Sequence, residues 1–587
     1  MIRAFWARHY ERGRCSFIFL AIMLLVLAKF TWLKYGDLII DTGRELYVPA
    51  KLAGGALLYK DIFYLYGPFS PYFNALLFKI FGVHISSLLV GGIITAALTT
   101  LAIYRLSRQF LKVAASTITA LTFLVLLAFG HYTYLGNYNF ILPYSYPATH
   151  AILFALASFF FFFRFLRDQQ RKPLILAGAS LCLCLLTRIE IGIMLGAALS
   201  GAILLNTSSR SRAALLVQCV FLPLAVAGAV YAGFAIASAG KLNDSNIWDL
   251  LKSNTATSSP FAAWLAGTDA PLANLRLMMN AAFFYCFLIA WASAGAWGLR
   301  KIPTLALTPL ARAGGCAMIM LLAAGIFFFL EHVFTFEHQY RPLPIIYLLT
   351  IFLARDLKLA VLSFFSLLLA SRMLLDMHPW HYGFYILVPG LIVYHAFFFR
   401  IIPDRIKVPK PAMHGAFFLM LSIFLTHYLL VSRSYYAGRT LPVISDRGTL
   451  NMIDSEIGRS SRLLVTFLKE NTADKATVVV LPEGLTINFL TGRDNPLYYY
   501  SYLPQDLARD SINDAVIREL KEKKVDYIVL VNRPLEEYGK HAFGQDYAQK
   551  IWGYVSDHYA PYAGIGPMPY TSEARGQFSA RIYQRKE

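Results

Sequence analysis

Charged residues and cysteines are scarce in this 587-residue sequence. Asp, Glu, Lys and Arg make up 15% of it, whereas 57% is hydrophobic; soluble globular domains average about 25% charged residues. The composition therefore excludes an ordinary soluble domain and indicates a polytopic membrane protein. No disulfide framework is indicated, because the polar C-terminal region has no cysteine. All six lie in or beside apolar segments: Cys15, Cys182, Cys184, Cys219, Cys286 and Cys316.

The signatures of common soluble enzymes are also missing. The sequence has no Walker loop, zinc-ligand spacing, nucleophile elbow or glycine-rich dinucleotide loop after a strand. Its net charge of +20 comes from short Lys/Arg clusters between apolar runs. Such clusters orient membrane spans, whereas a nucleic-acid-binding protein carries its basic residues on one face. We therefore expect no nucleic-acid partner, and any chemistry must arise in the loops between spans.

The apolar runs predict thirteen membrane spans, since a span needs about 20 mostly apolar residues. The first follows a basic N-terminus without a small-residue cleavage site, so we interpret it as a retained anchor rather than a signal peptide. The predicted spans are 16–34, 84–104, 113–130, 148–166, 173–188, 190–206, 213–238, 275–298, 313–330, 342–354, 359–375, 383–399 and 414–432.

Lys and Arg are concentrated in alternate loops, and this predicts the orientation of the chain. The loops 131–147 and 376–382 contain neither residue, whereas the loops on the opposite side are rich in both. The alternation predicts a cytoplasmic N-terminus, with the 36–82 loop and the C-terminus outside. From about residue 433 the composition becomes polar, and this change divides the chain into a membrane module, 1–432, and an extracytoplasmic domain, 433–587.

Both outer regions have predictable secondary structure. In the first loop, an apolar stripe at helical spacing over 73–81 predicts an interfacial helix with Tyr72, Asn74 and Lys79 on its polar side. A second helix is expected over 41–52. In the C-terminal domain, helices over 457–470 and 513–524 precede apolar strands at 477–481 and 525–531. This alternation predicts an α/β domain with at least partly parallel strands.

Four acids, Asp37, Asp41, Glu45 and Asp61, cluster in the first outer loop. Acids beside a membrane span are costly unless they face water or serve a site. Asp41 suits a helix N-cap, and it also suits a general base held at the outer membrane face; the two roles are compatible. Asp37 and Glu45 are interpreted as solvated or supporting acids. Asp61 is the second candidate for the base.

The first outer loop has a distinctive series of residues: Asp41, Gly54-Gly55, Leu58-Tyr59-Lys60-Asp61, Tyr66-Gly67-Pro68 and Phe81-Gly82. With this series the loop resembles the GT-C glycosyltransferases, in particular the bacterial branch similar to protein O-mannosyltransferases and lipid A aminoarabinose transferases. The resemblance implies a GT-C membrane module whose leading acid, at the position of Asp41, is catalytic. The family often has Asp-Glu where this chain has Asp41-Thr42, so the second acid is not carried over.

The segment Glu337–Pro344, before the tenth span, is similar to the family's aromatic, basic and proline entry to a late span. The resemblance implies a sugar donor that carries a lipid phosphate. Arg341, with His338 and Tyr340, is the predicted site for this phosphate, because a guanidinium group binds phosphate through two hydrogen bonds. A snorkelling anchor at the interface is an equal alternative for Arg341.

Four further outer residues are candidates to line the cavity that would hold the donor: Glu331, His332, His378 and His381. The two histidines at 378 and 381 could share a ligand, although interfacial packing explains them better. Arg188 and Glu190 are expected to neutralise each other at a tight outer turn. The sequence assigns no metal ligands and no cofactor. A divalent cation stays open as a cofactor.

The resemblance implies transfer of a sugar from a polyprenyl-phosphate donor to a lipid, glycan or protein acceptor, with inversion, in the bacterial inner (plasma) membrane. Membrane lipids are the remaining partners. Two other classes stay open. A lipid or sugar transporter or flippase would show inverted repeats and broken spans, and neither is evident. A scaffold displaying the outer domain would leave the clustered acids unexplained.

Overall fold

The computed structural model describes residues 13–133, 136–206, 209–239, 241, 260–300, 339–406 and 410–586. The helices up to residue 438 are α2 (Arg14–Thr31), α3 (Thr42–Ala53), α4 (Phe69–Phe81), α5 (Ile85–Ser107), α6 (Val113–Thr122), α7 (Tyr146–Asp168), α8 (Arg171–Leu185), α9 (Ile189–Asn206), α10 (Ser209–Leu216), α11 (Leu222–Ala237), α14 (Pro260–Ala266), α15 (Pro271–Arg300), α17 (Leu343–Leu353), α18 (Leu357–Ala370), α19 (Gly383–Ala396), α20 (Ile402–Ile406) and α21 (Lys410–Gly438). π-Helical turns η1 (Phe123–Ala128), η2 (Val217–Phe221) and η5 (Phe397–Ile401) continue α6, α10 and α19.

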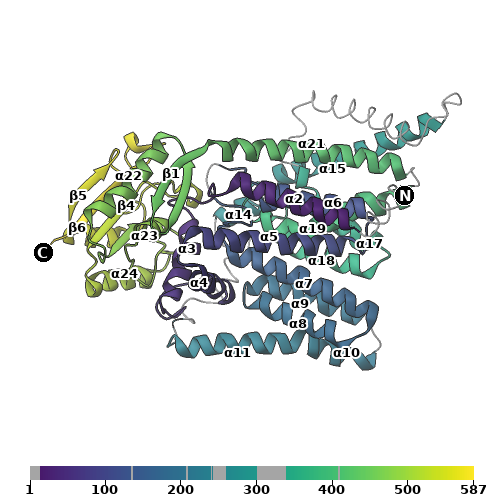
Figure 1. Cartoon of the computed structure of the whole chain (residues 1–587), viewed down its shortest axis with the longest axis horizontal. Coiled ribbons are helices and arrows are strands. Elements are labelled where there is room, and N and C mark those ends of the chain that lie inside the picture. The colour runs from purple at the N-terminus through teal and green to yellow at the C-terminus, as the bar shows by residue number, and fades with distance from the viewer. Residues whose placement is uncertain are drawn as a thin grey trace.

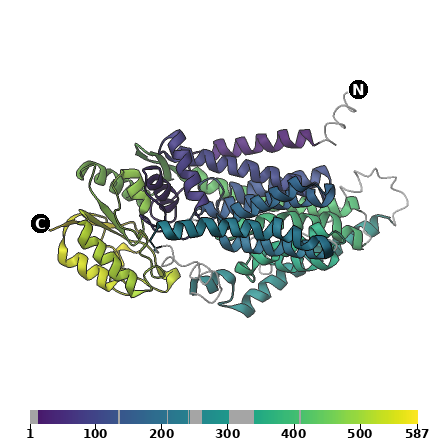
Figure 2. The same ribbon diagram turned by 90° about the horizontal axis from the view of Figure 1, so that it is seen from below.

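The protein is a helical polytopic membrane protein with a C-terminal α/β domain. In the described part of the chain, seven helical stretches are long and apolar enough to cross a membrane, and three shorter apolar ones accompany them. The predicted count of thirteen spans is not confirmed, and the predicted span 313–330 lies outside the described residues. Figures 1 and 2 both show the long helices side by side, with the sheet-containing domain at one end of the bundle.

The loops predicted to lie outside gather at that same end. The Tyr146 N–H at the start of α7 donates to Glu45 of α3 over 3.1 Å. The Phe69 N–H at the start of α4 donates to the carbonyl of Leu186, between α8 and α9, over 3.0 Å. Three predicted outer loops therefore meet one another, which agrees with the alternation of Lys and Arg.

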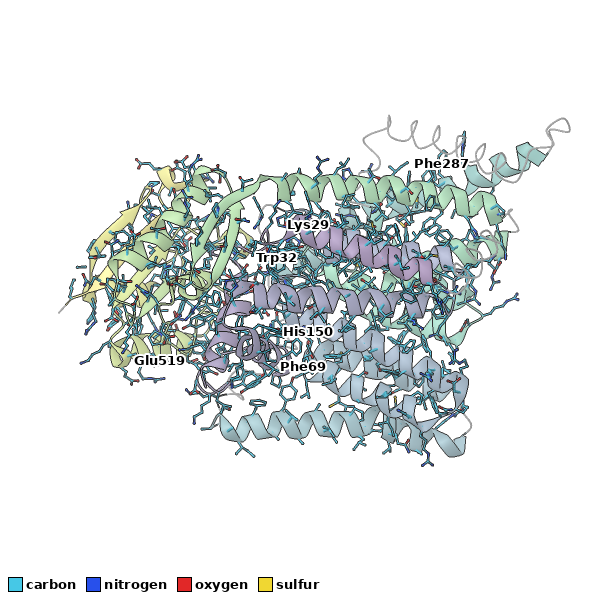
Figure 3. All side chains as sticks on the ribbon, viewed as in Figure 1. Lys29, Trp32, Phe69, His150, Phe287 and Glu519 are labelled. Atoms are coloured by element: carbon cyan, nitrogen blue, oxygen red, sulfur yellow. The ribbon has the colours of Figure 1, made fainter. Side chains whose placement is uncertain are left out.

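The two helices predicted in the first outer loop are present as α3 and α4. Figure 3 shows the labelled Phe69 of α4 next to His150 of α7, and their ring centroids are 6.1 Å apart. Ile80 and Phe81 of the predicted apolar stripe are exposed, as an interfacial helix requires. The prediction for Asn74 was wrong: it is buried, because that side of α4 packs against protein.

The C-terminal domain begins where α21 ends. An antiparallel hairpin, β1 (Arg439–Ser445) and β2 (Gly448–Ile453), precedes a four-stranded sheet of order β3-β4-β6-β5. Its strands are β3 (Val478–Leu481), β4 (Tyr527–Val531), β5 (Tyr559–Ile565) and β6 (Ala580–Arg585), and its helices are α22 (Glu456–Asn471), α23 (Leu485–Thr491), α24 (Asp510–Lys523) and α25 (Gln549–His558). The parallel β3–β4 pair was predicted; β5 and β6 were not.

The two faces of this sheet join different cores, because successive side chains of a strand point to opposite faces. Val478 and Val529 belong to the large core that continues into the helical bundle. Val479 and Ile528 belong to a second core within the C-terminal domain, beneath α24 and α25. One face of the sheet is therefore part of the interface with the membrane module.

The short helix α23 lies directly against α3. A Cβ atom at Gly43 would stand 2.3 Å from the backbone nitrogen of Thr486, so only glycine permits this approach. Farther along α3, the Lys51 ammonium pairs with Asp494 at 2.8 Å, and the Tyr47 hydroxyl donates to the same carboxylate. The first outer loop and the C-terminal domain thus form one packed unit.

We expect Gly43→Ala to separate this unit and to lower the free energy of unfolding by about 1–3 kcal/mol, as overpacking does. The measurement is thermal unfolding of the detergent-purified protein. Gly201→Ala in α9 is the matched control, because a Cβ there meets nothing within 4 Å. Equal melting temperatures for the two variants would mean that the approach of α23 to α3 is looser than described.

Candidate functional site

Asp41 occupies the N-cap position of α3 in an unusual backbone conformation, with φ 61° and ψ −48°. Its side chain makes no capping hydrogen bond to the helix, so the expected capping role is not present. Its backbone N–H instead donates to Oε1 of Glu483 in the C-terminal domain over 3.1 Å. Non-glycine residues held at a sparsely populated positive φ cost about 1–3 kcal/mol and concentrate at functional sites. Because the Asp41 carboxyl makes no capping hydrogen bond, it is available for a functional role.

The surroundings of Asp41 favour its neutral form. Burial and the nearby Glu483 carboxylate raise its pKa to about 7, against the opposing effect of Arg44 and Arg533. A general base works best when its pKa lies near the working pH. A half-buried carboxyl with such a pKa, at the junction of two domains, is a functional-site candidate on physical grounds.

Asp37 and Asp61 serve the backbone of the loop. Oδ1 of Asp37 accepts the N–H groups of Ile39 and Ile40 at 2.8 and 2.9 Å, which fixes the turn leading to Asp41. Asp61 is exposed, and its carboxylate accepts the Leu57 N–H over 2.7 Å. Asp61 is thus a turn residue at the surface.

Glu45 is a supporting residue, and the solvated interpretation was wrong. Its side chain is only 2% exposed and pairs with the Arg44 guanidinium at 3.0 Å. Burial raises the pKa of Glu45, whereas Arg44 and the N–H of Tyr146 lower it. Arg44 also donates to the carbonyl of Tyr144. Arg44 is therefore held firmly, one helical turn from Asp41.

Next to Arg44 lies a buried cluster of arginines and tyrosines. Arg188 pairs with Glu190 at 2.7 Å, and both side chains are at most 5% exposed. Their predicted pairing is confirmed. The ring centroid of Tyr66 lies close to two guanidinium groups, 5.4 Å from that of Arg44 and 4.6 Å from that of Arg188. Arg372 stands 3.8 Å from Glu190.

This cluster holds more positive than negative charge. Its charged members are Arg44, Arg188, Arg372, Glu45 and Glu190. In the described part of the chain, Nη1 of Arg188 and Oε2 of Glu190 are buried without a hydrogen-bond partner. Guanidinium groups bind phosphate well, so the cluster is suited to an anionic group. The sequence did hint at it, since an Arg–Glu pair interrupts an apolar run, but the gathering of three arginines comes only from the fold.

Arg341, His378 and His381 lie together in a second network. The Arg341 guanidinium pairs with Asp376 at 2.6 Å, and His378 lies 3.4 Å from the same carboxylate. The rings of His378 and His381 contact through nitrogens 3.2 Å apart. Burial and His378 lower the pKa of His381 to about 3, so it is neutral at pH 7.

Tyr138 connects this network with Asp41. Its ring centroid is 4.9 Å from that of His381, and it interacts electrostatically with Asp41. Tyr340 is placed differently, because its ring packs inside the bundle against Tyr394 and Tyr428. The remaining candidates, His338, Glu331 and His332, lie outside the described residues.

A metal site is not evident in the part of the chain that the structure describes, where no three His, Cys, Asp or Glu side chains are grouped to hold an ion. Ring nitrogens of His378 and His381 lie 3.2 Å apart, and a ring nitrogen of His378 lies 3.4 Å from the Asp376 carboxylate. The charged groups that act on the Asp41 carboxyl are Glu483, Arg44, Arg533 and Glu537.

Comparison with known proteins supports the resemblance seen in the sequence. Residues 66–236 match the family model of dolichyl-phosphate-mannose-protein mannosyltransferases. The match confirms the predicted likeness to GT-C glycosyltransferases. It covers less than a third of the chain and begins after Asp41, so the role of Asp41 rests on the structure and on the loop pattern. No curated protein matches the chain in sequence.

Several solved structures are similar to the whole chain. The oligosaccharyltransferase of Archaeoglobus fulgidus, solved with zinc and sulfate, is 13% identical with a TM-score of 0.48, over 96% of this chain and 73% of that one. ArnT from Cupriavidus metallidurans, bound to undecaprenyl phosphate, is 11% identical with a TM-score of 0.42, over 96% and 97%. The mycobacterial arabinofuranosyltransferase AftD is 14% identical with a TM-score of 0.42, over 97% and 40%.

Proposed function

We propose that the protein is a membrane glycosyltransferase that moves a sugar from a polyprenyl-phosphate donor to an acceptor at the extracytoplasmic face. The observation that carries the proposal is the Asp41 carboxyl, which is free of capping bonds, has a pKa raised to about 7 and lies within the electrostatic reach of Arg44 and Arg533. The match to a mannosyltransferase family supports the same reaction class.

In the proposed reaction, the acceptor oxygen attacks C1 of the sugar from the side opposite the phosphate. The C1–oxygen bond to phosphate breaks, and its electron pair leaves with the polyprenyl phosphate. Ionised Asp41 takes the proton of the acceptor hydroxyl, so atoms and charge balance. Attack from the opposite side inverts the anomeric centre. Guanidinium groups stabilise the charge that develops on the phosphate.

The proposed location is a bacterial inner membrane, with the N-terminus in the cytoplasm and residues 433–587 as an extracytoplasmic domain. The clustering of the outer loops and the C-terminal domain at one end of the bundle supports this orientation. A lipid-linked donor then reaches the site from the bilayer, and the acceptor comes from outside. The acceptor is a lipid, a glycan or a protein.

Two arginine groups are available for the donor phosphate. The sequence favours Arg341, whose pairing with Asp376 would be exchanged for the phosphate. The structure adds Arg44 and Arg188, which lie on the α3 side of the site and together with Arg372 outnumber their two glutamates. Because the two arginine groups are separate, substitutions in each group test its contribution to donor binding and transfer independently.

We expect Arg341→Lys to raise the KM for the donor about tenfold or more while leaving acceptor KM unchanged. Lysine keeps the charge but loses the planar fork, and a hydrogen bond to a charged group contributes about 1.5–3 kcal/mol. Initial rates at varied donor concentration give the result. Arg105→Lys, in the last turn of α5, is the matched control. An unchanged donor KM in both Arg341→Lys and Arg341→Ala would remove Arg341 from the site.

The experiment that tests the function itself uses purified protein in proteoliposomes and a panel of labelled polyprenyl-phosphate sugars, including mannose. Transfer is scored by release of polyprenyl phosphate together with labelled product. We expect one class of donor to be consumed. Movement of an intact donor across the bilayer without release of polyprenyl phosphate would instead identify a flippase.

A further inference from the structure

The parallel strands β3 and β4 end at the edge of the sheet that faces α3. Two residues beyond the end of β3 stands Glu483, and two beyond the end of β4 stands Arg533. Because adjacent parallel strands end at the same edge, these side chains are brought together there. The Arg533 guanidinium pairs with Oε2 of Glu483 at 3.2 Å. The edge thus presents an ion pair to the first outer loop.

Glu483 divides its two oxygens between the two domains. Oε2 accepts from Arg533, and Oε1 accepts the backbone N–H of Asp41. The Glu483 side chain is 15% exposed and that of Arg533 5%. The Arg533 guanidinium also pairs with the Glu537 carboxylate at 2.6 Å. Both oxygens of Glu483 are therefore engaged, and its position is fixed from within the C-terminal domain.

We propose that Glu483, fixed by Arg533, is a positioning residue for Asp41, so that docking of the C-terminal domain completes the active site. This proposal rests on the proposed role of Asp41 as the base. The hydrogen bond holds Asp41 in its positive-φ conformation, which is unfavourable for a non-glycine residue. The Glu483 charge also keeps the Asp41 carboxyl basic enough to accept a proton near neutral pH.

The groups facing Asp41 fix the sign of each variant's effect. The negative charges of Glu483 and Glu537 raise the pKa of Asp41, and the positive charges of Arg44 and Arg533 lower it. Two tyrosines, Tyr138 and Tyr538, interact with the same carboxyl. Removing the Glu483 charge must therefore lower the pKa of Asp41, and removing the Arg533 charge must raise it.

The test measures protonation of Asp41 without relying on activity. Dicyclohexylcarbodiimide reacts with protonated carboxyl groups, so the full-length protein in detergent is labelled at a series of pH values. Mass spectrometry of the peptide containing residues 37–45 then gives the fraction labelled at Asp41. Asp41→Asn is the blank for the assignment. The pH of half-labelling is compared among wild type, Glu483→Gln, Arg533→Gln and Arg533→Lys.

We expect half-labelling of wild type near pH 7. Glu483→Gln keeps an oxygen for the Asp41 N–H but loses the charge, so its midpoint should fall by roughly one pH unit. Arg533→Gln should shift it upward, and Arg533→Lys should leave it near wild type. A merely structural role would change stability without these opposite shifts. Should Arg533→Gln fail to fold, the Glu483→Gln midpoint decides alone.

Equal midpoints in wild type and Glu483→Gln would overturn the proposal, because it requires the charge of Glu483, and not only an oxygen at that position, to act on the Asp41 carboxyl. The outcome is separable from that of the proposed function. Shifted midpoints in a protein that consumes no lipid-linked sugar would keep the coupling of Glu483 to Asp41 and reject the glycosyltransferase. Sugar transfer that depends on Asp41, together with unshifted labelling midpoints, would keep the glycosyltransferase and reject the coupling of Glu483 to Asp41.

Discussion

Asp41→Asn is expected to slow sugar transfer on the order of 10²–10⁴-fold, the usual contribution of a general base. Asparagine has nearly the same size, tolerates positive φ and keeps the backbone N–H that donates to Glu483. Because the Asp41 side chain makes no capping bond, the substitution removes little besides the basic carboxylate. Elution profile and melting temperature should therefore match those of wild type.

Asp37→Asn and Asp61→Asn are the controls from the same loop. Asp37 holds a turn through its carboxylate, and an amide oxygen can replace that acceptor. Asp61 is an exposed turn residue. We expect both variants to retain turnover within about tenfold of wild type, below the range for a general base. Normal transfer by Asp41→Asn together with a dead Asp61→Asn would move the base to the other acid.

Arg188→Met is expected to reduce the free energy of unfolding by about 3–5 kcal/mol, because it leaves the buried Glu190 carboxylate without its 2.7 Å partner. The double variant Arg188→Met/Glu190→Leu should recover most of this loss, since well-packed apolar residues often replace a buried ion pair without cost. Thermal unfolding of the two variants in detergent measures both effects.

The double variant also separates structure from function at this cluster. If Arg188 stabilises the donor phosphate, the double variant, with its stability restored, should transfer sugar at least about tenfold more slowly than wild type. Loss of a hydrogen bond to a charged group has an effect of this size. Wild-type transfer by a stable double variant would show that the arginine cluster only holds the helices together, and Arg341 would remain the candidate for the phosphate.

The features that the sequence predicted correctly depend on neighbours in the chain. The helices α3 and α4 follow from apolar spacing and from prolines within one short loop. The parallel β3–β4 pair follows from two apolar runs, each preceded by an amphipathic helix. The strand β5 contains Pro561 and Gly564 and alternates poorly, so it gave no comparable signal.

The residues that the sequence missed are distant partners. Glu483 lies 442 positions from Asp41, and no local pattern links them. Arg341 was interpreted as a phosphate ligand or an interfacial anchor, whereas the fold places Asp376 beside it. Glu45, interpreted from the sequence as a solvated or supporting acid, is buried because Arg44 and the start of α7 enclose it.

The pH dependence of transfer tests the central claim, that ionised Asp41 is the base. Its pKa is raised to about 7, so protonation on going below pH 7 removes the base. The account predicts that kcat/KM of wild type for the donor falls about tenfold per pH unit below that value and levels off above it. A flat profile from pH 5 to pH 8, with the protein still folded, would contradict it.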